Sequence, residues 1–215
     1  MRDIVFFREG LVNMEKKKIQ ELIKNREKYC VEENFVGIGS TRKVFKVSEY
    51  VIKIHKHNLG YKQSKNELII YKKMWEKGFN ELFAQTYYVD ESLSIQKYYK
   101  PIALRNNQSY KLDMKKDTKL FPNKYEEILK LLEEEFDCFD LEDTSNYGLN
   151  EQGKLIFIDY GMTKKLYEEE WRPLAESGII RQIEYDYCNV CGIKIELHIY
   201  GDNDSDRRCY MCGKE

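Results

Sequence analysis

Residues 153–161 read GKLIFIDYG, and Asn146 stands seven positions before Gly153 in the stretch DTSNYG. The apolar letters LIFI predict a short buried strand, and the glycine ahead of them predicts a turn. Asp159 follows the strand directly, and Gly161 lies two positions further on. The chain therefore places an amide and a carboxylate on either side of a turn and a buried strand.

The N-terminal half is rich in strand signals. Residues 34–54, NFVGIGSTRKVFKVSEYVIKI, alternate and carry β-branched side chains, which predicts two or three antiparallel strands with turns at GIGS and SEY. Residues 84–89 and 93–99 predict two more strands, and residues 63–78 predict a helix between the two groups. This half therefore reads as an antiparallel sheet with one helix.

Glycines and charged residues of this half mark a candidate site. Gly37 and Gly39 form the first predicted turn, where glycine lets backbone N–H groups approach phosphates, although a glycine pair is also typical of an ordinary hairpin. Lys53 ends an apolar strand and needs a counter-charge if that strand is buried. Glu67, in the predicted helix, is the candidate partner; alternatively, both residues are ordinary surface charges.

Taken in order, the glycine turn, strand lysine, helix glutamate, loop asparagine and Asp-x-Gly resemble the protein-kinase signature set. In that family the glycines cover the phosphates of ATP, the lysine pairs with the glutamate, and the asparagine and aspartate hold Mg²⁺ or Mn²⁺. A valine after the glycines lies over the base. The resemblance covers residues 34–162 and assigns these positions to Gly37, Gly39, Val44, Lys53, Glu67, Asn146 and Asp159.

The chain departs from the family pattern in several places. Arg42 replaces the third glycine of the loop, and Asp-Tyr-Gly replaces Asp-Phe-Gly. No Ala-Pro-Glu follows, and fewer than 30 residues separate Gly161 from a cysteine-rich segment, so the large helical lobe of typical kinases does not fit. The chain is closer to the smallest atypical members: RIO-like kinases, the KEOPS-complex kinase and small kinase-like proteins of bacteriophages. The residues Thr144-Ser145-Asn146 are similar to the catalytic loop of the KEOPS kinase.

The catalytic loop departs furthest. The family places a catalytic aspartate five residues before the asparagine, but position 141 here is leucine. Asp140 lies six residues before Asn146 and Asp143 lies three before it. We favour Asp140 as the residue that orients the acceptor hydroxyl, with Asp143 as the alternative; if neither reaches it, the chain is a pseudokinase.

Two CxxC pairs lie near the C-terminus, Cys188 with Cys191 and Cys209 with Cys212, separated by 17 residues. Four thiolates at this spacing predict a closed, tetrahedral and structural Zn²⁺ site of the zinc-ribbon type. The alternative is a pair of disulfides. Residues 194–200 between the pairs alternate as a strand, so His198 is expected to be a strand residue and not a ligand.

These elements give an α+β fold class: a two-lobed, minimal protein-kinase-like fold with a small C-terminal zinc ribbon. Further helices are predicted over residues 13–30, 124–136 and 165–183. The expected parts are an N-terminal arm and lead helix (1–33), an upper lobe (34–100), a lower lobe (101–183) and the ribbon (184–215).

Composition limits the setting. The net charge is −1, which does not favour nucleic acid as a partner, and acids outnumber bases within the ribbon. A protein partner or substrate, or capping of the neighbouring domain, is expected instead. No apolar run is long enough to span a membrane, and the first residues make a poor signal peptide, so we expect a cytoplasmic protein whose cysteines are metal ligands and free thiols.

The resemblance therefore implies an ATP- and Mg²⁺-dependent phosphotransferase, with a protein serine or threonine as the expected acceptor. Lys53, Glu67, Asn146 and Asp159 would position the nucleotide. The alternatives are a pseudokinase that grips a protein partner as an inhibitor or scaffold, and a small-molecule kinase or ATPase on the same fold.

Overall fold

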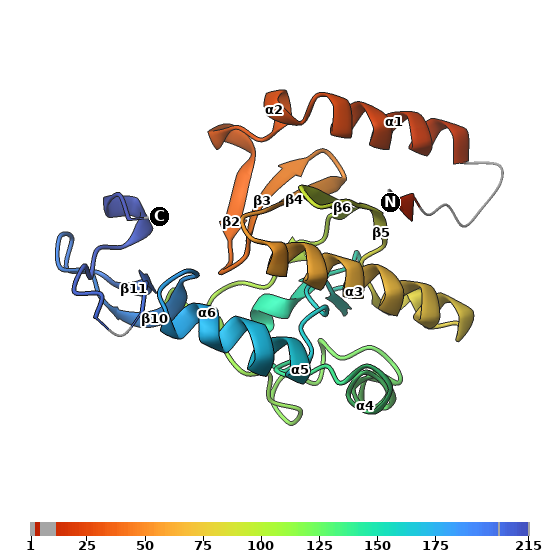
Figure 1. Cartoon of the computed structure of the whole chain (residues 1–215). Helices are drawn as coiled ribbons and strands as arrows, with labels where there is room; N and C mark the ends of the chain where they lie inside the picture. The colour runs from red at the N-terminus through yellow and green to blue at the C-terminus, as the bar shows by residue number, and fades with distance from the viewer. Residues whose placement is uncertain (1–2, 5–11, 202, 215) are drawn as a thin grey trace. The chain divides into compact units, whose positions relative to one another are not determined.

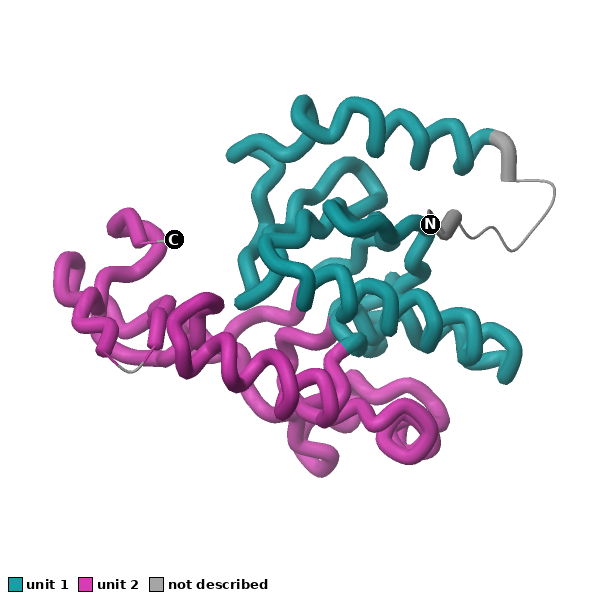
Figure 2. The backbone as a smooth tube through the Cα atoms, viewed as in Figure 1, with its two compact units in different colours: residues 1–100, 148–161 teal, residues 101–147, 162–215 magenta. Residues whose placement is uncertain are grey.

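The computed structural model of the chain describes residues 3–4, 12–201 and 203–214, and most of the predicted arm lies outside them. The chain divides into two compact units (Figure 2). Unit 1 comprises residues 1–100 and 148–161, and unit 2 comprises residues 101–147 and 162–215. Helices and antiparallel sheets are both present, so the α+β class predicted from sequence is confirmed.

Unit 1 is built on a six-stranded sheet of order β1-β5-β6-β4-β3-β2, in which every neighbouring pair is antiparallel. The strands predicted in the N-terminal half are present, with turns between them at the predicted places. Their bounds are β1 (Asp3–Ile4), β2 (Phe35–Ile38), β3 (Arg42–Val47), β4 (Tyr50–His55), β5 (Thr86–Val89) and β6 (Leu93–Lys97).

Helices cover both faces of this sheet (Figure 1). Helix α1 (Val12–Lys24) buries Ile19 and Leu22 against a core that includes Ile52. Helix α3 (Asn58–Glu76) packs against β4, β5 and β6. Because successive strand residues point to opposite faces, Ile52 faces α1 whereas Lys53 faces α3.

Two helix boundaries in unit 1 differ from the prediction. The single helix expected over residues 13–30 is split into α1 and α2 (Arg26–Tyr29), and a short 3₁₀ turn, η1 (Glu32–Asn34), follows. Helix α3 begins at Asn58, before the predicted start at 63, because the ring of His57 accepts a hydrogen bond from the N–H of Leu59 at 3.2 Å. Histidine is not among the usual N-cap residues, so this start carries no strong sequence signal.

The segment that returns to unit 1 carries the Asp-Tyr-Gly motif. Strands β7 (Lys100–Pro101), β8 (Tyr147–Leu149) and β9 (Leu155–Phe157) form a three-stranded sheet in that order. Gly153 has a φ of 71°, a left-handed conformation that glycine adopts without strain, so the predicted turn is present. The rings of Phe157 and Phe83 stack at 4.9 Å, and the 3₁₀ turn η2 (Asn80–Leu82) precedes Phe83. This contact fixes β9 within unit 1.

Unit 2 contains helix α4 (Tyr125–Phe136), a helical stretch over residues 164–176 and a two-stranded sheet. The helical stretch consists of α5 (Lys164–Leu166), the π-helix η4 (Tyr167–Trp171) and α6 (Arg172–Glu176). The remaining elements are η3 (Thr144–Asn146), β10 (Gln182–Tyr187), β11 (Lys194–Ile199) and η5 (Tyr210–Cys212). Strands β10 and β11 pair antiparallel.

The prediction of one helix over residues 165–183 is wrong at its C-terminal end. Gly178 has a φ of 74°, and the N–H groups of Gly178 and Ile179 bond to the carbonyls of Ala175 and Leu174 at 3.0 and 2.9 Å. This pair of hydrogen bonds is a Schellman cap, which satisfies the last helical carbonyls and ends the helix. Strand β10 then begins at Gln182, before the predicted change of module.

No helix within residues 12–201 and 203–214 is both long enough and apolar enough to cross a membrane.

Candidate functional site

Lys53 and Glu67 form a buried ion pair in unit 1. Strand β4 carries Lys53 and helix α3 carries Glu67, and their exposed fractions are 5% and 0%. Lys53 Nζ lies 3.2 and 3.1 Å from the two carboxylate oxygens of Glu67 and donates to the carbonyl of Ile158 at 2.8 Å. Burial lowers the pKa of Lys53, and the charge of Glu67 opposes that shift. The structure thus brings these two predicted site residues together.

Arg42, the first residue of β3, joins the same cluster. Its guanidinium donates to Glu67 Oε1 at 2.8 Å and to Asp159 Oδ1 at 2.6 Å. Burial would lower the pKa of Arg42, but the charges of Asp159 and Glu67 raise it. Two cations therefore face two carboxylates, and the four formal charges cancel.

Asp159 is held at the edge of this cluster. Its side chain is 42% exposed, whereas that of Arg42 is 5% exposed, so the carboxylate borders solvent. Burial alone would raise the pKa of Asp159, but the charges of Arg42 and Lys53 outweigh it and lower the pKa below its ordinary value. The carboxylate is therefore ionised and bonded to the guanidinium.

Gly161 explains how Asp159 comes so close to α3. A Cβ atom at this position would lie 2.1 Å from the carbonyl oxygen of Gln63 and 3.0 Å from Cγ of Glu67. The carbonyl of Gly161 also accepts a hydrogen bond from Asn66 at 3.0 Å. Only glycine permits this approach of the chain to the helix, and the approach places Asp159 within reach of the Glu67 cluster.

Tyr160 is the middle residue of the Asp-Tyr-Gly motif, and its hydroxyl has a partner. It is 1% exposed and donates to the carbonyl of Ala84 at 3.0 Å. Tyr160→Phe is therefore expected to lower the free energy of unfolding by about 1–3 kcal/mol, because it removes the donor to a buried carbonyl. Urea denaturation measures the change. Tyr187→Phe, at a side chain that is 62% exposed, is the control, and equal midpoints for both variants would contradict this role.

The glycine turn connects strands β2 and β3 of the hairpin. The N–H of Gly39 donates to the carbonyl of Arg42 at 2.9 Å. A Cβ atom added at Gly37 or Gly39 would meet nothing within 4 Å, so neither glycine is needed for packing within unit 1. Val44 lies directly opposite Lys53 in the sheet, and cross-strand partners share a face. Arg42, Val44 and Lys53 therefore lie on the face of the sheet that α3 covers.

The predicted catalytic loop belongs to unit 2. The side-chain amide of Asn146 donates to the carbonyl of Asp140 at 2.7 Å, which closes the loop across six residues. Asp140 has a φ of 57° and is exposed, whereas Leu141, the next residue, is 7% exposed. Desolvation raises the pKa of Asp140, and the charges of Asp143 and Glu142 add to that shift.

Asp143 has a structural role in the same loop. Its carboxylate accepts a hydrogen bond from the N–H of Ser145 at 2.8 Å and caps η3. The neighbouring loop of residues 105–117 is bonded alongside: Leu112 donates to Glu142 and Thr144 donates to Tyr110, at 2.8 and 2.9 Å. Of the two candidates, Asp140 is the carboxylate that the fold does not use as a helix cap.

The four cysteines of unit 2 meet at one point. Their sulfur atoms all lie within 4.8 Å of one another, and the sulfurs of Cys191 and Cys209 are 3.9 Å apart. Ligands at the usual zinc–sulfur distance in a tetrahedron lie roughly 3.8 Å apart, whereas disulfide sulfurs lie about 2.05 Å apart. The cluster can hold a metal ion, and the geometry fits the metal prediction rather than the disulfide alternative.

Backbone groups of the knuckles point at the sulfurs. Cys188 Sγ accepts hydrogen bonds from the N–H groups of Cys191, Cys209 and Val190, at 3.5, 3.3 and 3.4 Å. These bonds lower the pKa of Cys188 to about 6, which favours the thiolate that a metal requires. His198 lies in β11, where its Nδ1 is 3.3 Å from the guanidinium of Arg181, so it is placed as a strand residue.

A divalent cation fits poorly at Asp159. Oxygen ligands from one or two carboxylates are usual for Mg²⁺, but Asp159 Oδ1 is bonded to a guanidinium and a second buried cation belongs to the same cluster. Glu67 is likewise shared between Arg42 and Lys53. In this arrangement the positive charge at Asp159 comes from Arg42.

Arg42 is the member of this charged cluster that the sequence did not indicate, because its place in the glycine-rich stretch marks it only as the substitute for a glycine. The alternation of side chains gives one signal. Arg42 and Val44 are two residues apart in the strand and so point to the same face, which they share with Lys53, the cross-strand partner of Val44. Its contact with Asp159, 117 positions away, has no local signal.

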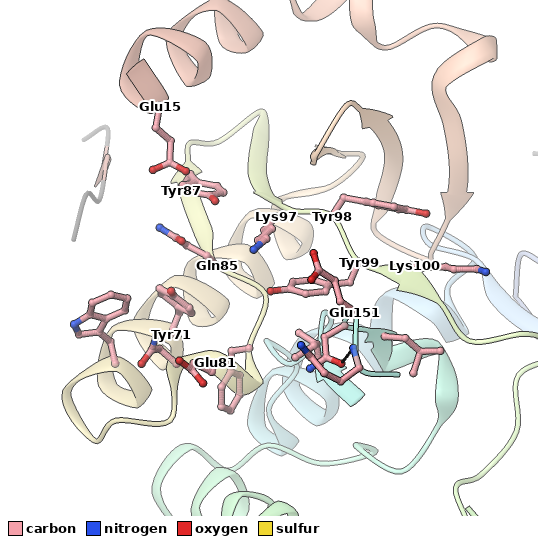
Figure 3. Close-up of a pocket in the computed structure, with 17 residues that line it drawn as sticks. Glu15, Tyr71, Glu81, Gln85, Tyr87, Lys97, Tyr98, Tyr99, Lys100 and Glu151 are labelled. Atoms are coloured by element: carbon pink, nitrogen blue, oxygen red, sulfur yellow. Dashed lines mark hydrogen bonds between the residues drawn. The ribbon is translucent and has the colours of Figure 1, made fainter. Parts of the chain in front are cut away.

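Unit 1 also contains a cavity of about 750 Å³, which Arg42, Lys53 and Asp159 do not line (Figure 3). Tyrosine and tryptophan rings surround it, and Lys97 lies over the ring of Tyr99 at 5.5 Å. Its charged lining residues are of both signs: Glu15, Glu81, Glu151, Lys97 and Lys100. The cavity therefore favours no class of ligand by charge.

No protein-family model matches the chain, and no curated protein matches it in sequence.

Proposed function

We propose that this chain has a minimal, two-lobed protein-kinase-like fold, binds ATP through unit 1 and transfers the terminal phosphate to a hydroxyl group. The observation that carries the proposal is the buried Lys53–Glu67 pair with Asp159 beside it. A fully buried ion pair is seldom favourable over apolar residues of the same volume, so its presence on a sheet face with an open glycine turn supports a role in binding. Lys53 and Arg42 are the groups that would meet phosphate oxygens.

Asp140 is the proposed orienting group for the acceptor. It is exposed, it lies two residues after the buried Cys138, and the Asn146 amide binds its carbonyl. A carboxylate with a raised pKa, close to a positioned hydroxyl, is suited to accept that hydroxyl's proton. The proposed acceptor is a serine or threonine of a protein.

The cysteine cluster is proposed to hold structural zinc and to brace the loop that carries Asp140. In unit 2 the hydroxyl of Tyr185, on β10, donates to the carbonyl of Asn106, in the loop bonded to residues 142–144. Three of the ribbon's four basic side chains are paired with carboxylates: Arg207 with Glu184 and Asp186, Arg208 with Asp206, and Lys214 with Asp204. This pairing favours capping or protein contact over nucleic acid as the role of the ribbon.

A second candidate is a kinase-like binding protein for which nucleotide is only a structural ligand. The Arg42–Asp159 bond favours this binding-protein candidate, because the bond occupies the carboxylate on which phosphotransfer in the protein-kinase family depends.

Label transfer from γ-labelled ATP separates the two candidates. ADP release and phosphorylation of the chain itself or of casein are measured with Mg²⁺, Mn²⁺ or EDTA, for wild type and Asp140→Asn. We expect wild-type turnover and a loss of about 10²–10⁴-fold in the variant. Equal turnover in Asp140→Asn would contradict the role of Asp140. Absence of turnover in folded, zinc-loaded wild type would favour the binding protein.

A further inference from the structure

The guanidinium of Arg42 has more partners than Asp159 alone. Arg42 is 4% exposed and bridges Glu67 and Asp159 at 2.8 and 2.6 Å. It also lies 3.3 Å from the hydroxyl of Ser64 on α3. Three partners from two separate segments therefore hold one guanidinium in a fixed position.

The position matters because of the charges around it. Lys53 and Arg42 both contact Glu67, and the charges of both lower the pKa of Asp159. Within unit 1 the two carboxylates are already neutralised. A divalent cation at Asp159 would meet two buried positive charges at short range, which opposes its binding unless the guanidinium leaves.

A guanidinium can do part of what the cation does. It carries a permanent positive charge and a planar fork of N–H donors that matches phosphate oxygens in pairs. Cationic clamps built from arginine and lysine stabilise phosphoryl groups in the same way as Mg²⁺, through charge placed in advance. Arg42 shares its sheet face with Lys53, and the Asp159 side chain bonded to it is 42% exposed.

We propose that Arg42 supplies the positive charge at Asp159 that a divalent cation supplies in the protein-kinase family, so that unit 1 binds a nucleoside triphosphate in its metal-free form. The inference rests on the proposed nucleotide binding. It makes Arg42 the residue that determines which form of the nucleotide is bound.

Isothermal titration of ATP into the zinc-loaded full chain tests this, either in buffer stripped of divalent cations by a chelating resin before the chain is added, or with excess Mg²⁺. Wild type is expected to bind ATP equally well, within about threefold, in both conditions. Arg42→Gln is expected to weaken binding without Mg²⁺ by about tenfold or more, and Mg²⁺ is expected to restore it because Asp159 is then released. Arg26→Gln, at an exposed arginine of α2, is the control and should bind as wild type does.

Asp159→Asn provides a second variant that keeps the guanidinium. It is expected to retain ATP binding in the metal-stripped buffer and to gain nothing from Mg²⁺. Wild-type binding that falls about tenfold or more in the metal-stripped buffer would overturn the inference and leave the proposed nucleotide binding standing. An unchanged metal-free affinity in Arg42→Gln would also overturn it. Absence of ATP binding in every condition would overturn both proposals.

Discussion

Replacing Cys209 with serine is expected to abolish the proposed zinc binding of unit 2 and to unfold the segment that begins with β10 and carries the four cysteines. Cys209 is 1% exposed, its backbone pairs with Leu197, and its sulfur lies 3.9 Å from that of Cys191. The buried core around the knuckles consists of Cys188, Leu197, Ile199 and Cys209, which is too small to fold by itself. Binding of structural zinc contributes on the order of 10 kcal/mol to such sites, and that contribution would be lost.

Two measurements test this prediction. Elemental mass spectrometry gives the zinc content per chain, and limited proteolysis shows whether the segment is folded. Wild type should carry one zinc ion, and Cys209→Ser should carry none and be cleaved within the ribbon. Cys30→Ser is the control because Cys30 packs in unit 1 and should leave the zinc in place. A zinc-free wild type that resists proteolysis as well as the variant does would show that the cysteines are not a structural metal site.

Glu67→Gln is expected to lower the free energy of unfolding of unit 1 by about 3–5 kcal/mol, because it leaves two buried cations opposite one carboxylate. The Glu67 side chain is 0% exposed and receives both Arg42 and Lys53, at 2.8 and 3.1 Å. Glutamine keeps the shape of the side chain, so the loss measures the missing charge and not a cavity.

The matched control lies on the same helix. Glu76 pairs with Lys73 at 3.0 Å, but its side chain is 63% exposed, so Glu76→Gln should change the free energy of unfolding by about 0.5 kcal/mol or less. Urea denaturation of both variants gives the comparison. Combining Glu67→Gln with Lys53→Met should recover part of the loss, because one unpaired cation is removed. Equal midpoints for wild type and Glu67→Gln would show that the cluster carries no stability.

Tyrosine at position 160 and glycine at position 161 show how a sequence motif and its packing are connected. The letters DYG were readable as a motif, but the reason for each letter is tertiary. The hydroxyl of Tyr160 has its acceptor at Ala84, and Gly161 is required by the backbone of Gln63. Both Ala84 and Gln63 are far from the motif in the sequence, so no local pattern predicts these two contacts.

The sequence by itself determined the local elements and the four cysteines that can hold a metal ion. The strands over residues 34–54 follow from the alternation of side chains with period two, and the cysteine cluster follows from the chemistry and spacing of four thiols. Both depend on residues that are close together in the chain or that share a rare chemistry, so pattern and composition are sufficient to find them.

Only the tertiary structure decided where the helical stretch of unit 2 ends, which aspartate caps the loop, and what Arg42 contacts. The Schellman cap at Gly178 competes with a helical pattern that continues past it, and its bonds to Leu174 and Ala175 decide the outcome. Arg42 meets Asp159 because strand register and the return of the chain into unit 1 bring them together. The topology of the fold decides which distant residues meet, so a buried ion pair between them cannot be predicted from the residues next to each partner in the sequence.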